Sequence, residues 1–371
     1  MPPAIGPSAW GPGVAGGKLL TANSDKPKAH MTKRVTLRDV AREADVHIST
    51  ASRALNPKTR SIVNRDTVER VLETATRLEY RPHPLAQGLR TNRTMSVGMV
   101  IPDIENPLFG PVIAGAEQVL GSEGYSLLIT NTDISESQTS AVVEALLERR
   151  VDGIILATAS RSDDVIRDLA ERGVHMVLVN RSTEGIPVPA ILADDLTGIA
   201  LAVDHLVQLG HTRIGHVAGP QHLSTGLGRH QAFLTRMQSL NLAIDSSAVE
   251  ESTWYQVDPG YKAARTLLER RPDLTAIVAA NDLIALGCYR AVRESGREVG
   301  VDVSITGYND IPLLDLMQPP MTSVRVPYRQ MGVEAANTLL EMMASGSPAG
   351  RPISIRLTPV LSVRESTAPP A

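Results

Sequence analysis

The strongest constraint on the fold is a series of short apolar runs that begins near residue 96 and alternates with helical segments. The runs read VGMVIP, YSLLIT, DGIILA, HMVLVN, AILA, RIGHVAG, TAIVAA and VSITGY. Runs such as GIILA at 153–157 are apolar on both faces, which a strand buried inside a parallel sheet requires. The alternation therefore predicts an α/β body made of parallel sheets that are covered by helices.

The runs are too numerous for one small sheet, and their order predicts two similar α/β lobes. We expect the first lobe to comprise residues 95–193 and 328–353, and the second to comprise residues 194–327 and 354–366. A closing helix over 328–344 and a last strand over 353–357 would complete the sheets. Ligands of such folds bind at the carboxyl ends of the strands, so two facing lobes predict a ligand-binding cleft between them.

A second pattern, VTLRDVAREADVHISTASRALN at residues 35–56, predicts two short helices joined by a tight turn. Thr36 and Asp39 stand three residues apart, as in a capping box, and apolar residues recur at helical spacing after them. The small side chains of Ala44 and Ala51 permit a close helix crossing. An amphipathic hairpin inside a larger core is the alternative that this pattern alone leaves open.

The second of these helices begins with side chains suited to DNA. Ile48, Ser49, Ser52 and Arg53 stand where a recognition helix meets base edges. Serine reaches phosphate or base, and arginine pairs bidentately with guanine. A third helix would complete a helix-turn-helix head over residues 35–82.

Charge is distributed unevenly along the chain. Residues 31–94 carry 13 Lys and Arg against 7 Asp and Glu, a net charge of +6, whereas residues 95–371 carry 21 against 32, a net charge of -11. A basic head on an acidic body indicates that the head alone binds nucleic acid. Residues 1–34 are rich in Pro, Gly, Ala and Ser and are expected to form a disordered tail that is not a secretory signal.

The composition restricts the size and setting of the protein. The chain has 371 residues, of which 42% are hydrophobic, so two or more units with their own cores are expected. It contains one cysteine, Cys288, which excludes an intramolecular disulfide and indicates a reducing, cytoplasmic environment. No apolar run is long enough to span a bilayer, so no membrane partner is expected.

In order and spacing, the motifs of this chain resemble those of the LacI/GalR family, the lactose/galactose-repressor family of bacterial transcription regulators. They are T-L-x-D-V-A and V-x-x-x-T-x-S-R-x-L-N in the head, R-P-x-x-x-A-x-x-L at 81–89, P-D-I-x-N-P-x-F at 102–109, H-L-x-x-L-G-H at 205–211, A-N-D-x-x-A-L-G at 280–287 and G-Y-N-D at 307–310. The resemblance covers nearly everything after residue 35. It implies a hinge linker over 83–94 and a two-lobed effector domain like that of periplasmic binding proteins.

The resemblance also implies a function. The protein is expected to be a sequence-specific transcription regulator, a repressor, whose affinity for a palindromic operator in double-stranded DNA is controlled by a small-molecule effector. The head residues expected to face bases are Ile48, Ser49 and Arg53, those expected to hold phosphate are Thr50, Ser52 and Asn56, and Thr36 completes the DNA-binding set. In the linker, Leu85 and Ala86 are expected to contact DNA, and Leu89 is expected to insert into the minor groove.

The effector-binding residues implied by the resemblance are Asn106, Phe109, Asn180, Thr225, Arg229, Trp254, Asn281 and Asn309. Amides and a guanidinium can hydrogen-bond neighbouring hydroxyl groups, and an indole covers the apolar face of a sugar ring, so a sugar or sugar derivative is expected. Asn180 and Asn309 depart from the family pattern, in which Asp is common, and this loss of charge favours an anionic sugar derivative. His47 replaces the usual Ser or Thr cap of the recognition helix, which predicts a cap weaker by about 1 kcal/mol.

Other polar groups have ordinary interpretations. The spacing of His205, His211, His216, His222 and His230 lacks the compactness of a metal site, so we expect surface or capping histidines, no metal and no cofactor. The adjacent carboxylates at 194–195 are expected to cap a helix rather than to catalyse a reaction.

Two other functions are compatible with parts of the sequence. A solute-binding protein of a sugar transport system would share the two-lobed body, but the basic head and the absence of a signal segment argue against it. A cytoplasmic sugar enzyme is disfavoured because the sequence has no Gly-rich nucleotide loop and no paired base and nucleophile, so the protein is not expected to be an enzyme.

A homodimer is expected because one head contacts only half of a palindromic site. The linker helix over 84–90 is short and contains Gly88, so it should be stable only where two copies meet on DNA. No heptad of leucines follows the last strand, so a helical bundle that would form a tetramer is not expected.

The first prediction concerns Leu89→Ala. Loss of the apolar wedge should lower affinity for the operator and leave the salt-dependent binding of the basic head to random DNA nearly unchanged. Equilibrium binding to both DNAs at several salt concentrations measures the effect. Equal losses on both DNAs, or no loss on either, would show that Leu89 is only a connecting residue.

Overall fold

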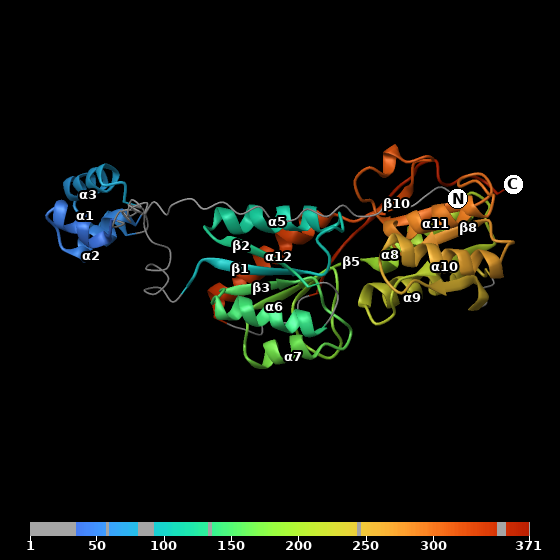
Figure 1. Cartoon of the computed structure of the whole chain (residues 1–371), viewed down its shortest axis with the longest axis horizontal. Coiled ribbons are helices and arrows are strands. Elements are labelled where there is room, and N and C mark those ends of the chain that lie inside the picture. The colour runs from blue at the N-terminus through green and yellow to red at the C-terminus, as the bar shows by residue number, and fades with distance from the viewer. Residues whose placement is uncertain are drawn as a thin grey trace, which may run out of the picture. The chain divides into compact units, whose positions relative to one another are not determined.

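The computed structural model describes residues 35–56, 59–80, 93–132, 136–242, 246–346 and 354–370 (Figure 1). The chain divides into two compact units, residues 1–82 and residues 83–371. The expected disordered tail over 1–34 and the linker residues Leu85, Ala86 and Leu89 lie outside the described residues.

The head is a small bundle with its own core. It consists of α1 (Leu37–Glu43), α2 (Ile48–Leu55), the 3-10 helix η1 (Arg60–Ile62) and α3 (Arg65–Arg77). The core is built from small and β-branched side chains, among them Val40, Ala51 and Val71, all fully buried. Reciprocal hydrogen bonds between Thr36 and Asp39 confirm the capping box, with N···O distances of 3.4 and 3.0 Å. The three helices close over one another, so the pair is not a hairpin inside a larger core.

The first lobe is built on a parallel sheet with the strand order β11-β5-β4-β3-β1-β2. Its strands are β1 (Ser96–Ile101), β2 (Ser126–Asn131), β3 (Gly153–Leu156), β4 (Met176–Val179), β5 (Ala190–Ala193) and β11 (Ser354–Leu357). One face packs on α5 (Phe109–Ser122) and α12 (Tyr328–Ser345), and the other packs on α6 (Glu136–Glu148) and α7 (Asp164–Glu171). The central strands β3 and β4 are buried at every position, as their apolar sequences predict.

The second lobe repeats this architecture with the strand order β12-β10-β9-β8-β6-β7. Its strands are β6 (Ile214–Ala218), β7 (Val249–Glu251), β8 (Ala276–Ala279), β9 (Ser304–Asn309), β10 (Thr322–Arg325) and β12 (Val360–Ser362). Only β12 runs antiparallel to its neighbour. The helices pack in two pairs, α8 (Asp195–Gln208) with α9 (Ser224–Ser239) and α10 (Val257–Arg270) with α11 (Asp282–Glu294), and the short helices η2 (Ser246–Ala248) and η3 (Leu314–Leu316) lie in loops.

The chain passes between the lobes three times, from β5 to α8, from β10 to α12 and from β11 to β12. The last passage corrects the expected boundary, which assigned residues 354–366 to the second lobe. Strand β11 pairs with β5 in the first sheet, with Ser354 opposite Ala190, and only β12 joins the second sheet. The half-buried side chains of Ile355 and Leu357 pack against the core and hold β11 in the first sheet.

Two glycines bring α5 and α12 into close contact in the first lobe. A Cβ atom on Gly332 would lie 2.0 Å from the carbonyl oxygen of Val112, and one on Gly115 would lie 2.0 Å from that of Arg329. Both obstacles are backbone atoms, so a larger residue can fit only if the helices separate.

The second prediction follows from this contact. Gly332→Ala should lower the free energy of unfolding by about 2 kcal/mol, because the added methyl overpacks the helix pair. Gly121→Ala is the matched control on α5, since its nearest neighbour is the flexible side chain of Glu117 at 3.5 Å. The control should be neutral or more stable by up to about 1 kcal/mol. Denaturant unfolding measures both, and equal stabilities would refute the close contact.

Candidate functional site

The helix α2 of the head turns one face to solvent and buries the other. Ile48 is 37% exposed and Arg53 is also exposed, whereas Ala51 and Ala54 are buried in the head. The residues expected to face bases therefore lie outside the core of the head, which is the arrangement that contact with DNA requires.

His47 caps α2 in place of Ser or Thr. Its Nδ1 accepts the backbone N–H of Ser49 at 3.3 Å and lies 2.7 Å from the Ser49 hydroxyl oxygen. The imidazole thus satisfies one of the N–H groups that a helix start leaves open. The ring nitrogen thus supplies an acceptor at this position, and the lower strength of the His47 cap stays a prediction.

Two arginines donate hydrogen bonds to backbone carbonyls just before α2 and near its end. Arg70 on α3 donates from Nε to the carbonyl of Ala44 at 3.0 Å, in the turn between α1 and α2. Arg60 donates from Nε to the carbonyl of Ala54 at 3.1 Å, near the end of α2. These two bonds tie the turn before α2 to α3 and the last turn of α2 to η1.

The remaining head residues of the DNA-binding set lie on or beside these helices. Ser49, Thr50, Ser52 and Asn56 are half-buried along and just after α2. Thr36 caps α1, and its hydroxyl lies 2.7 Å from a carboxylate oxygen of Asp39. Their contacts with DNA stay a prediction.

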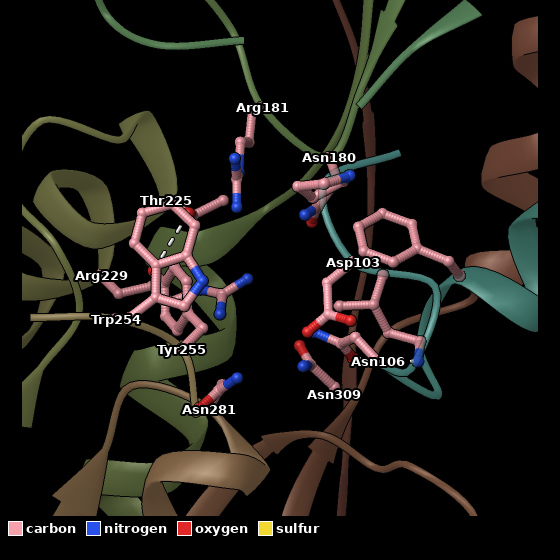
Figure 2. A pocket seen from close by; sticks show the side chains of 13 residues that line it. Asp103, Asn106, Asn180, Arg181, Thr225, Arg229, Trp254, Tyr255, Asn281 and Asn309 are labelled. Carbon is pink, nitrogen blue, oxygen red and sulfur yellow. Dashed lines mark hydrogen bonds between the residues drawn. The ribbon is translucent and has the colours of Figure 1, made fainter. Parts of the chain in front are cut away.

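A polar cleft lies at the carboxyl ends of strands from both lobes (Figure 2). The structure brings together all eight residues expected to bind the effector: Asn106, Phe109, Asn180, Thr225, Arg229, Trp254, Asn281 and Asn309. Leu108, which lies between two of them, also lines the cleft, and four lining residues were not expected from the sequence: Pro102, Asp103, Arg181 and Tyr255.

Buried strands place the four asparagines in this cleft. Asn106 and Asn180 follow β1 and β4 in the first lobe, Asn281 follows β8, and Asn309 ends β9 in the second lobe. Because parallel strands of one sheet end at the same edge, residues far apart in the sequence meet at the cleft. Burial of the strands leaves only their ends available for polar chemistry.

Three of these amides are anchored by their carbonyl oxygens. Asn106 Oδ1 accepts the backbone N–H two residues later at 3.2 Å. Asn281 caps α11, and its Oδ1 accepts the N–H of Ile284 at 2.8 Å. Asn309 Oδ1 accepts the hydroxyl of Tyr328 at 2.6 Å. Among the described residues none accepts a hydrogen bond from the three NH₂ groups, which leaves them able to donate to a ligand.

Arg229 has a structural role in the wall of the cleft. It is 2% exposed, donates from Nε to Asp195 at 2.9 Å and from Nη1 to the carbonyl of Ala280 at 2.8 Å, and its guanidinium lies 3.9 Å from the ring centroid of Tyr308. Removal of the guanidinium would leave a half-buried carboxylate unpaired, which is destabilising. Arg229 therefore supports the wall in addition to any contact with a ligand.

Both the head and the body match models of known protein families. Residues 36–83 match the model of bacterial regulatory proteins of the lacI family, and residues 203–367 match a periplasmic binding protein-like domain. The transcriptional regulator reg1 of Streptomyces lividans is 37% identical over 347 residues, which cover 91% of this chain and 97% of the relative. The chain belongs to the LacI family.

Solved structures of LacI-family proteins have the same fold. The Lac repressor dimer bound to its operator and the anti-inducer ONPF is 27% identical with a TM-score of 0.80, over 91% of this chain and 100% of that one. The CelR–cellobiose complex is 30% identical with a TM-score of 0.69, over 90% of this chain and 100% of that one. The predicted fold class is confirmed, and this LacI-family protein is a DNA-binding transcription regulator rather than an enzyme or a solute-binding protein.

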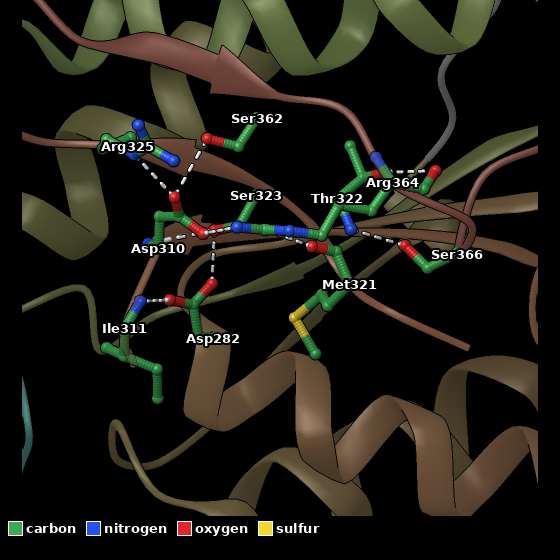
Figure 3. A network of polar contacts seen from close by, with 10 residues as sticks. All are labelled: Asp282, Asp310, Ile311, Met321, Thr322, Ser323, Arg325, Ser362, Arg364 and Ser366. Carbon is green, nitrogen blue, oxygen red and sulfur yellow. Dashed lines mark hydrogen bonds and ion pairs between the residues drawn. The ribbon is translucent and has the colours of Figure 1, made fainter. Parts of the chain in front are cut away.

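A network of polar groups lies behind Asn281 and Asn309 in the second lobe (Figure 3). Asp310 pairs with Arg325 at 2.7 Å and with Arg364 at 2.8 Å, and its N–H donates to the Ser323 hydroxyl oxygen at 3.1 Å. That hydroxyl donates to Asp282 at 2.5 Å. The network therefore joins the start of α11 to the ends of β9 and β10, where the two asparagines enter the cleft.

The two carboxylates of this network differ in protonation. Burial raises the pKa of Asp282 to about 7, and the negative charge of Asp310 acts in the same direction. Burial also opposes ionisation of Asp310, but hydrogen bonds from Arg325 and Arg364 hold the pKa of Asp310 below its usual value. Asp310 is thus the charged member, and Asp282 can carry a proton near neutral pH.

The other expected polar groups are accounted for. Asp194 caps α8 by accepting the N–H of Thr197 at 3.2 Å, as expected, whereas Asp195 pairs with Arg229, which the sequence did not reveal. The expectation of surface histidines is corrected for His211 and His216, which are 1% and 0% exposed. His211 bonds Thr275, Ser304 and the carbonyl of Ala368. His216 donates from Nδ1 to the carbonyl of Val278 at 2.8 Å.

Within the described residues, no group of three His, Cys, Asp or Glu side chains is placed to hold a metal ion. None of the helices that the structure describes is both long enough and apolar enough to cross a membrane.

The third prediction concerns the proton on Asp282. Its pKa is raised by folding from 3.8 to about 7, so its contribution to stability is full below pH 4 and is lost as the pH rises toward 7. An amide mimics the protonated carboxyl, because its oxygen can accept the N–H of Ile311 and its NH₂ group can donate to the Ser323 hydroxyl oxygen, which reverses the bond that the carboxylate accepts. Between pH 5 and pH 8, the stability of Asp282→Asn relative to wild type should therefore rise by about 1 kcal/mol or more.

Asp258→Asn, an exposed position on α10, is the control. Its stability relative to wild type should show no comparable rise over the same range. Unfolding at several pH values measures both variants. A pH-independent difference for Asp282→Asn would show that this carboxyl is ionised throughout.

Proposed function

We propose that this protein is a homodimeric repressor that binds a palindromic operator through its heads and a sugar or sugar derivative through its cleft. The observation that carries the proposal is that one chain joins a helix with an exposed polar face, α2 of the head, to a body with a polar cleft between two lobes. The effector controls operator affinity, and operator DNA must alter effector affinity by the same factor.

In the head, Arg53 is proposed to pair with guanine, and Ile48 and Ser49 are proposed to contact neighbouring base edges. Thr36, Thr50, Ser52 and Asn56 would contact the DNA backbone and position the helix. In the linker, Leu85, Ala86 and Leu89 are proposed to contact the minor groove. The exposure of Ile48 and Arg53 on one face of α2 supports the roles proposed for the head.

In the cleft, the proposed effector ligands are Asn106, Phe109, Asn180, Thr225, Arg229, Trp254, Asn281 and Asn309. The three anchored amides offer donors to hydroxyl oxygens, and the Trp254 indole offers an aromatic face for a sugar ring. The similarity to a cellobiose complex supports a sugar as the class of ligand.

A homodimer follows from the proposed operator, because one head contacts one half-site. The similar Lac repressor structure is a dimer bound to operator, which supports this assembly. The site of action is proposed to be the cytoplasm, where operator DNA is accessible.

The fourth prediction tests this function in full-length protein. Operator sequences are first selected from fragments of the source genome, and affinities for operator and random DNA are then measured. Arg53→Ala should lose operator affinity by about tenfold or more and should relax specificity at one base pair of each half-site. Arg167→Ala, an exposed arginine on α7, is the control and should bind as wild type does.

A second arm measures operator affinity with cellobiose, ribose, glucuronate and glucose 6-phosphate. Trp254→Ala should keep operator affinity and lose the response to the sugar that acts on wild type. Failure to select any specific DNA would refute the regulator, and a normal response in Trp254→Ala would remove this indole from the site.

A further inference from the structure

Arg181 is a buried cation without a carboxylate partner. It is 6% exposed, and its side chain points into the cleft near Trp254, with the guanidinium carbon 5.8 Å from the ring centroid (Figure 2). Its Nε is buried without a hydrogen-bond partner, and its guanidinium pairs with no acceptor among the described residues. A buried charge without a hydrogen-bond acceptor is destabilising, so Arg181 requires an acceptor that the described residues do not supply.

The backbone holds this side chain in place. Arg181 donates its N–H to the carbonyl of Val179 at 2.7 Å, two residues back, and Asn180 between them has a φ of 64°. Such a three-residue turn with a positive φ is rare and strained, and strain of this kind persists where the surrounding structure enforces it. The strained turn directs both Asn180 and Arg181 to the cleft.

The neighbouring charges do not neutralise Arg181. The carboxylate of Asp195 already pairs with Arg229, and that arginine adds a second positive charge to the same wall. Burial lowers the pKa of Arg181 to about 10, and the charge of Arg229 acts in the same direction. Arg181 is therefore still protonated at neutral pH, and it stands beside another cation.

Asp103 is the other charged side chain that lines the cleft. It belongs to the loop after β1, accepts the N–H of Glu105 at 2.9 Å and forms no ion pair with any described residue. Because Asp103 is half-buried, water can solvate it more fully than it can solvate Arg181, which is 6% exposed and has a buried Nε. Arg181, rather than Asp103, therefore requires a partner of opposite charge.

Hydrogen-bond donors are numerous in the cleft, beside the acceptors of Asp103 and of the buried, unpartnered Asn180 Oδ1. The NH₂ groups of Asn106, Asn281 and Asn309 can donate to a ligand, because only the oxygens of these amides are bonded, and the guanidinium of Arg181 adds further donors. Such a set of donors around a buried cation suits a ligand rich in acceptor oxygens.

We propose that the effector carries an anionic group, a carboxylate or a phosphate, that binds Arg181. This rests on the proposed function, since it names the class of ligand for the same cleft. The planar guanidinium forms two parallel hydrogen bonds to either group, and the amide donors then bind the remaining oxygens of the ligand. A neutral sugar would leave the Arg181 charge unpaired.

The fifth prediction uses full-length protein, glucose as the neutral probe, and glucuronate, glucose 6-phosphate and inorganic phosphate as anionic probes at constant ionic strength. At least one anion should raise the thermal midpoint of wild type more than glucose does at the same concentration. Arg181→Met should bind that anion about tenfold to a hundredfold more weakly. The response to glucuronate compared with glucose 6-phosphate separates a carboxylate from a phosphate.

Arg181→Lys keeps the charge but loses the planar fork, so an intermediate loss is expected, and it replaces Arg181→Met if that variant does not fold. Arg167→Met on α7 is the control and should bind as wild type does. The proposal is overturned if no anion exceeds glucose in wild type, or if the anion effect survives in the Arg181 variants.

Operator affinity in the same preparations separates this proposal from the proposed function. If a neutral sugar controls operator affinity and no anion binds, the assignment of Arg181 fails and the regulator stands. If no specific DNA is bound, the proposed function fails whatever Arg181 binds.

Discussion

The orientation of buried parallel strands is the constraint on which the rest of the body depends. Strands such as β3 and β4 have no exposed position, so polar side chains can enter only where a strand ends. Nearly all strands of each sheet run the same way, and the chain therefore collects Asn106, Asn180, Asn281 and Asn309 at two facing edges. The polar cleft is a consequence of the apolar sheets.

The interior of the protein determines which chemical groups face this cleft. The oxygens of three asparagines are occupied by a backbone N–H or by the Tyr328 hydroxyl, and the two guanidinium groups can only donate. Behind them, the network around Asp282 and Asp310 fixes the ends of α11, β9 and β10. The walls of the cleft are thus rigid and rich in hydrogen-bond donors. This favours ligands rich in acceptor oxygens, whichever residue each oxygen contacts.

The sequence predicted the elements that have strong periodic patterns and missed those that depend on context. The runs that became β1 to β6, β8 and β9 are apolar, whereas β7 and β10 read VEE and TSVR and carry no such signal. Family resemblance supplied eight lining residues but not Arg181, although a charged residue directly after a buried strand was a visible signal. The proton on Asp282 could not be predicted, because its burial depends on segments more than 25 residues away, around Ile311 and Ser323.

The three connections between the lobes contain one, two and two residues outside regular structure, after β5, β10 and β11. Three such short connections side by side prevent the lobes from sliding past each other or moving apart. Each connection can still change a few backbone torsion angles. The lobes are therefore left with essentially one easy movement, a rotation about an axis through the connections. A ligand bound between the lobes therefore acts mainly by fixing the angle of this rotation. Ligands of different shapes would produce different angles of one hinge rather than many distinct conformations.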